Sequence, residues 1–327
     1  MRWPVRSLAD SGLAIPSVTT GAPRIETLAV VGVGLIGGSF ALALKEARRV
    51  GSVVGVGRGR ENLDAALASG IVDRAVTLRE PWTREIESAD LVLVATPVGE
   101  FAALFAALAP HLRADAIVTD AGSTKESVIA AARAHLGSAF SRFVPGHPIA
   151  GTEHSGASAA FATLFRDRNV VLTPTAETDA AALATVTDLW SACGAHVRQL
   201  DPAAHDRIFA AVSHLPHLLA FALVDLLAAR PDADDVFRFA ASGFRDFTRI
   251  AASSPEMWRD ISLANRDALV GAIEAYRKQL AAVAAMVASA DGASLEAVYA
   301  RAAAARRAWG AAHRAAAAVP ADGSRER

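Results

Sequence analysis

A histidine held among prolines and glycines is the side chain of this sequence best suited to proton transfer. His147 lies in VPGHPIAGTEHSG, residues 144–156. A neutral imidazole is a general base whose pKa lies near working pH, and a rigid loop after a strand would fix its position. Ser123, in TDAGSTKESV (residues 119–128), is a second catalytic candidate. Both have structural alternatives, since a lone loop histidine is often solvated and Ser123 can cap a following helix with Glu126 closing a capping box.

A strand, a glycine turn and a helix follow one another in LAVVGVGLIGG, residues 28–38. This order is typical of a dinucleotide-binding site: the first glycine permits the turn, the second admits the pyrophosphate, and the third lets the helix approach the strand. Unpaired N–H groups at the helix N-terminus attract the anion. A glycine turn without a ligand is the alternative. The cofactor contacts we expect are Gly32, Gly34, Leu35, Ile36, Gly37, Thr96, Pro97 and Gly122.

The end of the second strand indicates which coenzyme is bound. An NAD site usually carries an acid about 20 residues after the glycine motif, where it binds the ribose 2′-hydroxyl. That position holds Gly57, and Arg58 and Arg60 follow. Guanidinium groups can fork onto a 2′-phosphate, so the sequence favours NADP over NAD. Use of both coenzymes, or two solvated surface arginines, remain the alternatives.

Three histidines share one expected helix in HDRIFAAVSHLPHLLAF, residues 205–221. His214 and His217 stand three residues apart, a spacing that also suits a metal ion. No carboxylate or cysteine cluster accompanies them, so we expect no metal site.

The elements that must position these residues fall into two groups. Short apolar strands alternate with helices up to about residue 174, which predicts an α/β fold with a doubly wound parallel sheet. Beyond a last strand at 196–200 the pattern is helical, with a kink expected at Pro216. Strands are expected at 27–31, 52–57, 91–96, 116–120, 142–144 and 170–173, and helices at 38–49, 61–69, 99–109, 124–136, 203–230, 255–288 and 293–317.

This division predicts a Rossmann-like nucleotide-binding domain over 25–190 and an all-helical domain over 191–318, flanked by a flexible leader (1–24) and a disordered tail (319–327). The 327 residues carry 33 Lys and Arg against 34 Asp and Glu, a net charge of −1. That balance gives no reason to expect nucleic acid or an anionic membrane as a partner. A single cysteine and no apolar run of membrane length favour a cytoplasmic protein.

Five segments together resemble the prephenate dehydrogenase family, which includes arogenate and cyclohexadienyl dehydrogenases. They are VGLIGGSFALALK, TDAGSTKESV, GHPIAGTEHSG, HDRIFAAVSHLPHLLAFAL and SGFRDFTRIAASSPEMWRDI. The resemblance covers about residues 25–290. It implies a Rossmann domain, a helical dimerisation domain that makes a homodimer, and an active site in the cleft between them. It also implies oxidative decarboxylation of prephenate, or of arogenate, with hydride transfer to NAD(P)+ in tyrosine biosynthesis.

The resemblance also assigns roles to individual residues. His147 accepts the hydrogen bond of the substrate C4 hydroxyl, and Ser123 bonds the same hydroxyl and orients the histidine. Arg249 binds the ring carboxylate. The remaining implied substrate contacts are His214, His217, Thr152 and Glu153, with Glu153, Asp246 and Arg249 forming an ionic gate, His205 and Asp206 bracing the helix, and Trp258 packing near the pocket.

Two other functions compete with this one. A β-hydroxyacid dehydrogenase would need a catalytic lysine on the helical domain, and Lys278 lies outside any motif we can assign. A non-catalytic nucleotide-sensing dimer would need neither His147 nor Ser123 nor Arg249. The sequence leaves open prephenate against arogenate, NAD against NADP, feedback by tyrosine, and the roles of His154 and His205.

Overall fold

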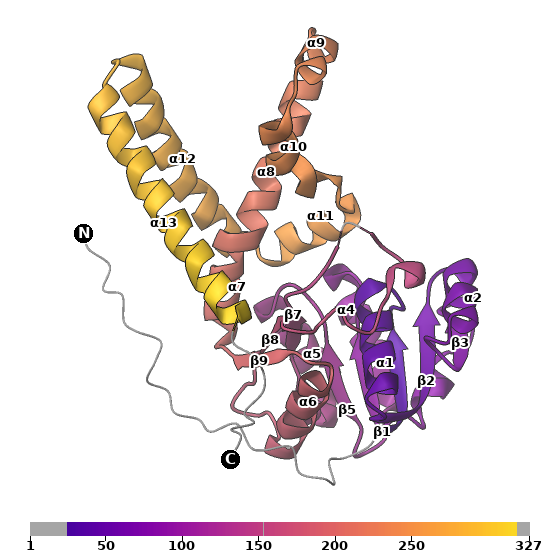
Figure 1. The fold of residues 1–327 in the computed structure, drawn as a ribbon. Coiled ribbons are helices and arrows are strands. Elements are labelled where there is room, and N and C mark those ends of the chain that lie inside the picture. Colours follow the sequence, from indigo (N-terminus) through magenta and orange to yellow (C-terminus); the bar gives the residue numbers. More distant parts are fainter. Residues whose placement is uncertain (1–24, 153, 319–327) are drawn as a thin grey trace, which may run out of the picture.

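The computed structural model describes residues 25–152 and 154–318, which form an α/β part carrying a helical part (Figure 1). The leader 1–24, the tail 319–327 and Glu153, for which the sequence made predictions, lie outside the described residues.

Six parallel strands, most of them short valine-rich runs, form the main sheet in the order β3-β2-β1-β4-β5-β6. The chain order reverses between β1 and β4, and the carboxyl edge at such a switch point is where ligands of doubly wound folds bind. The strands are β1 (Ile25–Val31), β2 (Val50–Gly57), β3 (Arg74–Thr77), β4 (Leu91–Val94), β5 (Ile117–Asp120) and β6 (Phe143–Val144).

Helices cover both faces of this sheet, so the core divides in two. Leu28 and Val30 of β1 pack on one side with Phe40, whereas Ala29 and Val31 pack on the other. This alternation along a strand buries apolar side chains on both faces. The helices are α1 (Leu35–Glu46), α2 (Arg60–Ala68), α3 (Thr83–Ile86), α4 (Phe101–Leu108), α5 (Glu126–His135) and α6 (Ala180–Ala192), with short turns η1 (Val98–Glu100), η2 (Ala109–His111), η3 (Gly137–Arg142) and η4 (Ala157–Ala159).

A second, three-stranded sheet carries the candidate base. It consists of β7 (Gly146–Pro148), β8 (Asn169–Leu172) and β9 (His196–Gln199), with β7 antiparallel to β8. His147 therefore lies in a strand opposite Val171, not in the loop that the sequence suggested. Because β9 pairs with β8, we propose that the domain junction lies between β9 and the next helix, later than the expected boundary at residue 190.

The helical part forms two projecting arms, one containing α8 to α10 and the other an antiparallel pair of α12 and α13 (Figure 1). Its elements are α7 (Pro202–Phe209), the π-helical turn η5 (Ala210–His214), α8 (Leu215–Ala228), α9 (Ala233–Arg238), α10 (Ser242–Thr248), η6 (Arg249–Ala252), α11 (Pro255–Ala264), α12 (Arg266–Ala288) and α13 (Gly292–Ala318). A kink was expected at Pro216, and the structure has the π-helical turn η5 just before it. Proline offers no N–H to the preceding turn.

Several sequence expectations need correction. Strand β3 and helix α6 were missed: β3 is a short, partly exposed edge strand, and α6 spans the expected domain boundary at residue 190. The helix expected over 255–288 breaks at Asn265. The continuous helix 202–228 is long and apolar enough, by length and composition alone, to span a membrane, so the expectation that no run reaches this length is wrong.

Candidate active site

The glycine loop has the shape that a dinucleotide requires. Gly32 has φ +102°, and a Cβ there would lie 2.6 Å from the Ala95 carbonyl. A Cβ on Gly37 would lie 2.4 Å from the Gly32 oxygen, so both positions accept only glycine without rearrangement. A Cβ on Gly34 would meet no described atom within 4 Å, which leaves room there for a pyrophosphate. These residues fit the dinucleotide that the sequence motif implies.

The N-terminus of α1 supplies the donors for this anion. Gly34 occupies the N-cap position, and no described side chain caps the helix. The first N–H groups, including those of Leu35 and Ile36, therefore point toward the loop with the helix dipole behind them. Three further expected contacts, Thr96 and Pro97 after β4 and Gly122 after β5, lie at the same carboxyl edge of the sheet.

Arg58, the expected phosphate ligand, is bridged to the helical part. Its two terminal nitrogens lie 3.1 and 3.3 Å from the carboxylate oxygens of Glu256 in α11. The hydrogen bond that Arg58 donates to Glu256 raises the pKa of Arg58, which therefore stays charged. Arg60 pairs instead with Asp64, 2.9 Å away on the exposed face of α2, as the surface alternative anticipated.

A hydrogen-bonded chain runs from His147 to the N-terminus of α5. His147 Nδ1 lies 2.9 Å from His205 Nε2, and His205 Nδ1 lies 2.8 Å from Asp206 Oδ1. Asp206 in turn accepts hydrogen bonds from the backbone N–H groups of Lys125 (2.8 Å) and Glu126 (2.9 Å). The chain thus joins β7, α7 and α5, three elements that come together only in the folded protein.

Burial sets the protonation of this chain. It lowers the pKa of His147 well below that of free histidine, and repulsion of protonated His147 by His205, when that ring is also protonated, and then by Lys125 lowers it further. Burial also lowers the pKa of His205. Burial opposes ionisation of Asp206, but hydrogen bonds from His205 and from the two α5 amides outweigh it and hold that pKa below its usual value. Two neutral imidazoles and a carboxylate are therefore the state at neutral pH.

Ser123 does not cap a helix, contrary to the local alternative. The helix α5 begins at Glu126, and Asp206 caps it from 80 residues away in sequence. The predicted capping box between Ser123 and Glu126 is absent from the described structure. Ser123 lies half-buried just before this turn, and the bond that orients His147 comes from His205.

A fully buried ion pair holds the serine loop against the histidine strand. The Lys125 ammonium bonds the Asp120 carboxylate and the Gly146 carbonyl, the latter at 2.6 Å. Asp120 also accepts hydrogen bonds from the N–H groups of Gly122 (2.7 Å) and Gly146 (3.0 Å). The end of β5 and the start of β7 are thereby fixed relative to each other, three residues from Ser123 and one residue from His147.

The helical part adds a second polar group around Trp258. The ring of His217 stacks on Trp258 with centroids 3.7 Å apart. Burial lowers the pKa of His217, and the positive charge of Arg249 lowers it further, so Arg249 lies on this face. Asn265 Nδ2 donates to the Asp206 carbonyl and lies 3.0 Å from His214 Nδ1.

This amide fixes the tautomer of His214. Because Asn265 donates to Nδ1, the His214 proton sits on the buried Nε2. Burial lowers the pKa of His214 to about 4, so the ring is neutral at working pH. A hydrogen bond to the backbone of Ser123 partly opposes this lowering, so His214 connects the helical part to the serine loop.

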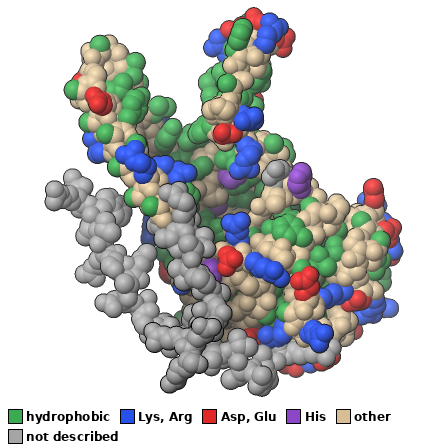
Figure 2. Space-filling model, viewed as in Figure 1, with side chains coloured by type: hydrophobic (Ala, Val, Ile, Leu, Met, Phe, Trp, Pro, Cys, Tyr) green, Lys and Arg blue, Asp and Glu red, His purple; other side chains and the backbone are tan. Residues whose placement is uncertain are grey.

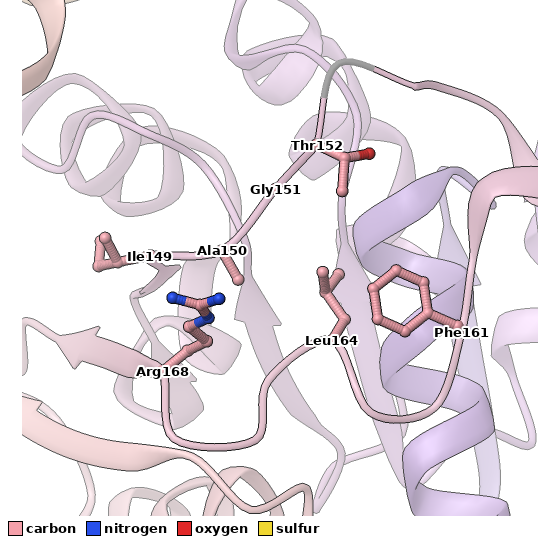
Figure 3. Close-up of a pocket in the computed structure, with 7 residues that line it drawn as sticks. All are labelled: Ile149, Ala150, Gly151, Thr152, Phe161, Leu164 and Arg168. Atoms are coloured by element: carbon pink, nitrogen blue, oxygen red, sulfur yellow. The ribbon is translucent and has the colours of Figure 1, made fainter. Parts of the chain in front are cut away.

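Thr152 lies on the loop that follows the histidine strand. It accepts a hydrogen bond from the His154 N–H (3.2 Å). A cavity of about 260 Å³ opens beside it, into which the Arg168 side chain points (Figure 3). Its lining is Ile149, Ala150, Gly151, Thr152, Phe161, Leu164 and Arg168. This cavity does not include His147, and Asp246 of the expected gate pairs with Arg245 at 3.5 Å.

Several residues that hold other side chains of the site in place were not predicted from the sequence. Asp120, Lys125 and Asn265 were not singled out, and Asp206 was taken only as a brace for its helix. The one available indication was the pair His205-Asp206 within a histidine-rich segment. No three His, Cys, Asp or Glu side chains in the described part of the chain are arranged to hold a metal ion.

Two family models match successive parts of the sequence. Residues 40–199 match the nucleotide-binding domain of prephenate dehydrogenase, and residues 201–300 match its dimerization domain. The cyclohexadienyl dehydrogenase of Zymomonas mobilis is 37% identical over 267 residues, covering 81% of this chain and 89% of that protein.

Solved structures agree with this match. The prephenate dehydrogenase of Aquifex aeolicus, in complex with hydroxyphenyl propionate and NAD+, superposes with a TM-score of 0.79 at 37% identity and covers 89% of this chain and 99% of its own. The arogenate dehydrogenase of Synechocystis superposes with a TM-score of 0.71 at 30% identity, covering 86% of this chain and 99% of its own.

Proposed function

This chain belongs to the prephenate dehydrogenase family, and we propose that it oxidatively decarboxylates prephenate, with arogenate as the alternative substrate of the same site. When bound, a nicotinamide coenzyme would supply the acceptor for the hydride that leaves ring C4. The C4 hydroxyl loses its proton, the ring carboxylate leaves as CO2, and the ring becomes aromatic. The protein must therefore orient C4, hold the carboxylates and accept one proton.

His147 accepts that proton. Its Nδ1 is occupied by His205, whereas Nε2 has no hydrogen-bond partner among the described residues, and the side chain is half-buried. A free imidazole lone pair beside the carboxyl edge of a dinucleotide-binding sheet is the observation that carries the proposal. The lowered pKa of His147 keeps the ring neutral, and a neutral ring is what a general base requires.

The substrate groups are held by side chains from both parts of the chain. Arg249 binds the ring carboxylate, because its planar fork can meet a carboxylate with two hydrogen bonds. His214 and His217, whose rings both contact Trp258, line the same side of the pocket. Ser123 hydrogen-bonds the C4 hydroxyl, and Thr152 and Glu153 contact the substrate from the loop after β7.

NADP is the favoured coenzyme in this proposal. Gly57 offers no carboxylate to a 2′-hydroxyl, and the Arg58 guanidinium at the end of β2 can bind a 2′-phosphate. Glu256 competes for that guanidinium, so NADP binding requires Arg58 to exchange one anion for another. The related Aquifex aeolicus enzyme was solved with NAD+, and acceptance of both coenzymes is consistent with the geometry.

The working form is a homodimer built through the helical part. Hydrophobic side chains line both arms (Figure 2), and only 17% of the most apolar stretch of helix 202–228 is buried in the single chain. Large apolar side chains remain exposed in α8, α11 and α12, among them Leu226, Leu263 and Val287. A second copy would cover these faces. We place this dimer in the cytoplasm, bound to neither membrane nor nucleic acid.

The test is the replacement of His147 by asparagine. We expect turnover to fall about 10²–10⁴-fold, because general-base catalysis typically contributes that much. Coenzyme binding, measured by fluorescence titration, should be unchanged. His135→Asn, on the exposed end of α5, is the matched control and should retain full activity. Wild-type turnover in His147→Asn would show that another group accepts the proton.

A further inference from the structure

We propose that His205 and Asp206 are positioning residues that fix the tautomer of His147, so that the lone pair of the base sits on Nε2 before any ligand arrives. The inference rests on the proposed role of His147 and adds two residues to it. Neither residue touches the substrate: His205 is 0% exposed and Asp206 is 1% exposed. They act through the hydrogen-bonded chain that ends on His147 Nδ1.

The direction of these hydrogen bonds is set at Asp206, where they end on the amides of α5. Asp206 accepts N–H groups from Lys125 and Glu126, so both of its oxygens are oriented as acceptors by the backbone of α5. An acceptor can be paired only with a donor, so His205 carries its proton on Nδ1. In a neutral ring the other nitrogen, Nε2, is then an acceptor.

The tautomer of His147 follows in the same way from that of His205. His205 Nε2, an acceptor, lies 2.9 Å from His147 Nδ1, which must therefore be the protonated nitrogen of that ring. His147 Nε2 is left with the lone pair. The opposite tautomer would place two acceptors against each other at this distance and present an N–H to the substrate hydroxyl, where it could not take a proton.

The hydrogen bonds of His205 and Asp206 are also suited to the protonated form of His147. When the C4 hydroxyl proton moves to His147 Nε2, the imidazolium keeps its Nδ1–H bond to His205, and the carboxylate of Asp206 lies behind that ring. No proton passes to His205 or Asp206. Packing supports this alignment, because the rings of His147 and His205 both contact Phe209, with centroids 4.8 and 4.5 Å from it.

The arrangement joins the two parts of the chain. His147 belongs to β7 of the α/β part, His205 and Asp206 to α7 of the helical part, and the capped amides to α5 (Figure 1). The base therefore acquires its working tautomer only when α7 is seated against both elements. A histidine in β7 alone would distribute its proton between the two nitrogens.

The direct test is ¹⁵N NMR of the imidazole nitrogens in the coenzyme-free enzyme. In the wild type we expect His147 protonated on Nδ1 with a lone pair on Nε2. In Asp206→Asn the amide can donate to His205, and the His147 resonances should shift toward the Nε2-protonated form. Asp201→Ala removes the N-cap of the same helix α7 without touching the chain, and should leave these resonances unchanged.

Kinetics of two His205 variants separate positioning from simple bracing. Glutamine places a carbonyl oxygen near the position of Nε2 and can still accept from His147. Asparagine is one bond shorter and can reach Asp206 but not His147. We expect kcat to fall about 10²–10⁴-fold in His205→Asn, as for other wrong-tautomer variants, and markedly less in His205→Gln, with KM little changed in both.

Several results would overturn the inference. One is a wild-type His147 protonated on Nε2, a measurement that needs no variant to fold. Another is His205→Asn or Asp206→Asn with wild-type kcat while His147→Asn is inactive, which would keep His147 as the base and remove its positioning residues. An active His147→Asn would instead contradict the proposed function itself.

Discussion

The buried pair of Asp120 and Lys125 allows the sharpest test of how the site is held together. Both side chains are 0% exposed, and the ammonium is shared between Asp120 and the Gly146 carbonyl. Lys125→Met keeps the side-chain length but leaves a carboxylate in the interior with only two backbone N–H donors, from Gly122 and Gly146. Breaking a buried pair on one side costs about 3–5 kcal/mol.

We therefore expect Lys125→Met to lower the free energy of unfolding by about 3–5 kcal/mol in urea denaturation at fixed protomer concentration. Adding Asp120→Asn removes the unpaired charge and should restore a large part of the loss. Arg60→Met is the matched control, because its pair with Asp64 is exposed and should cost under about 0.5 kcal/mol.

A cost of less than about 1 kcal/mol for Lys125→Met, or a double variant less stable than the single one, would contradict this role of the buried pair. The same variant should also reduce turnover at temperatures where it remains folded, because the pair fixes Ser123 relative to His147.

The remaining predictions concern pH, substrate and coenzyme. Because burial and neighbouring charge lower the pKa of His147, kcat/KM should stay level as the pH falls through about 6.5 and decline only in more acidic buffer; half-maximal activity at pH 6.5 or above would contradict this. Acid should also destabilise the fold, since His147 and His214 bind protons more readily when unfolded, so the free energy of unfolding should fall as the pH drops below about 6.5. Arg249→Gln should chiefly raise KM, and an unchanged KM would remove Arg249 from the carboxylate site. Arg58→Asp should shift preference from NADP toward NAD in paired steady-state assays, with Arg60→Asp as control; equal behaviour of the two variants would mean that the ribose is bound elsewhere.

The sequence determined the fold class and the backbone path of the glycine loop because both depend on local patterns. Short apolar runs specify strands buried on both faces, and glycine spacing specifies a backbone path that other residues cannot follow. Gly32 and Gly37 are confirmed in this role by the atoms that a Cβ would meet. The sequence failed for β3 and α6, whose partly exposed or alanine-rich stretches carry little of the periodicity that separates strand from helix.

The sequence could name His147 as a candidate base but could not say which of its nitrogens is free. That follows from His205, 58 residues away, and from the carboxylate of Asp206 that caps a helix 80 residues before it. It could name Arg58 but not its partner Glu256, 198 residues further along. The sequence specifies the type of each residue. The direction of a hydrogen bond, the burial of a side chain and the resulting pKa depend on neighbouring residues that only folding brings together.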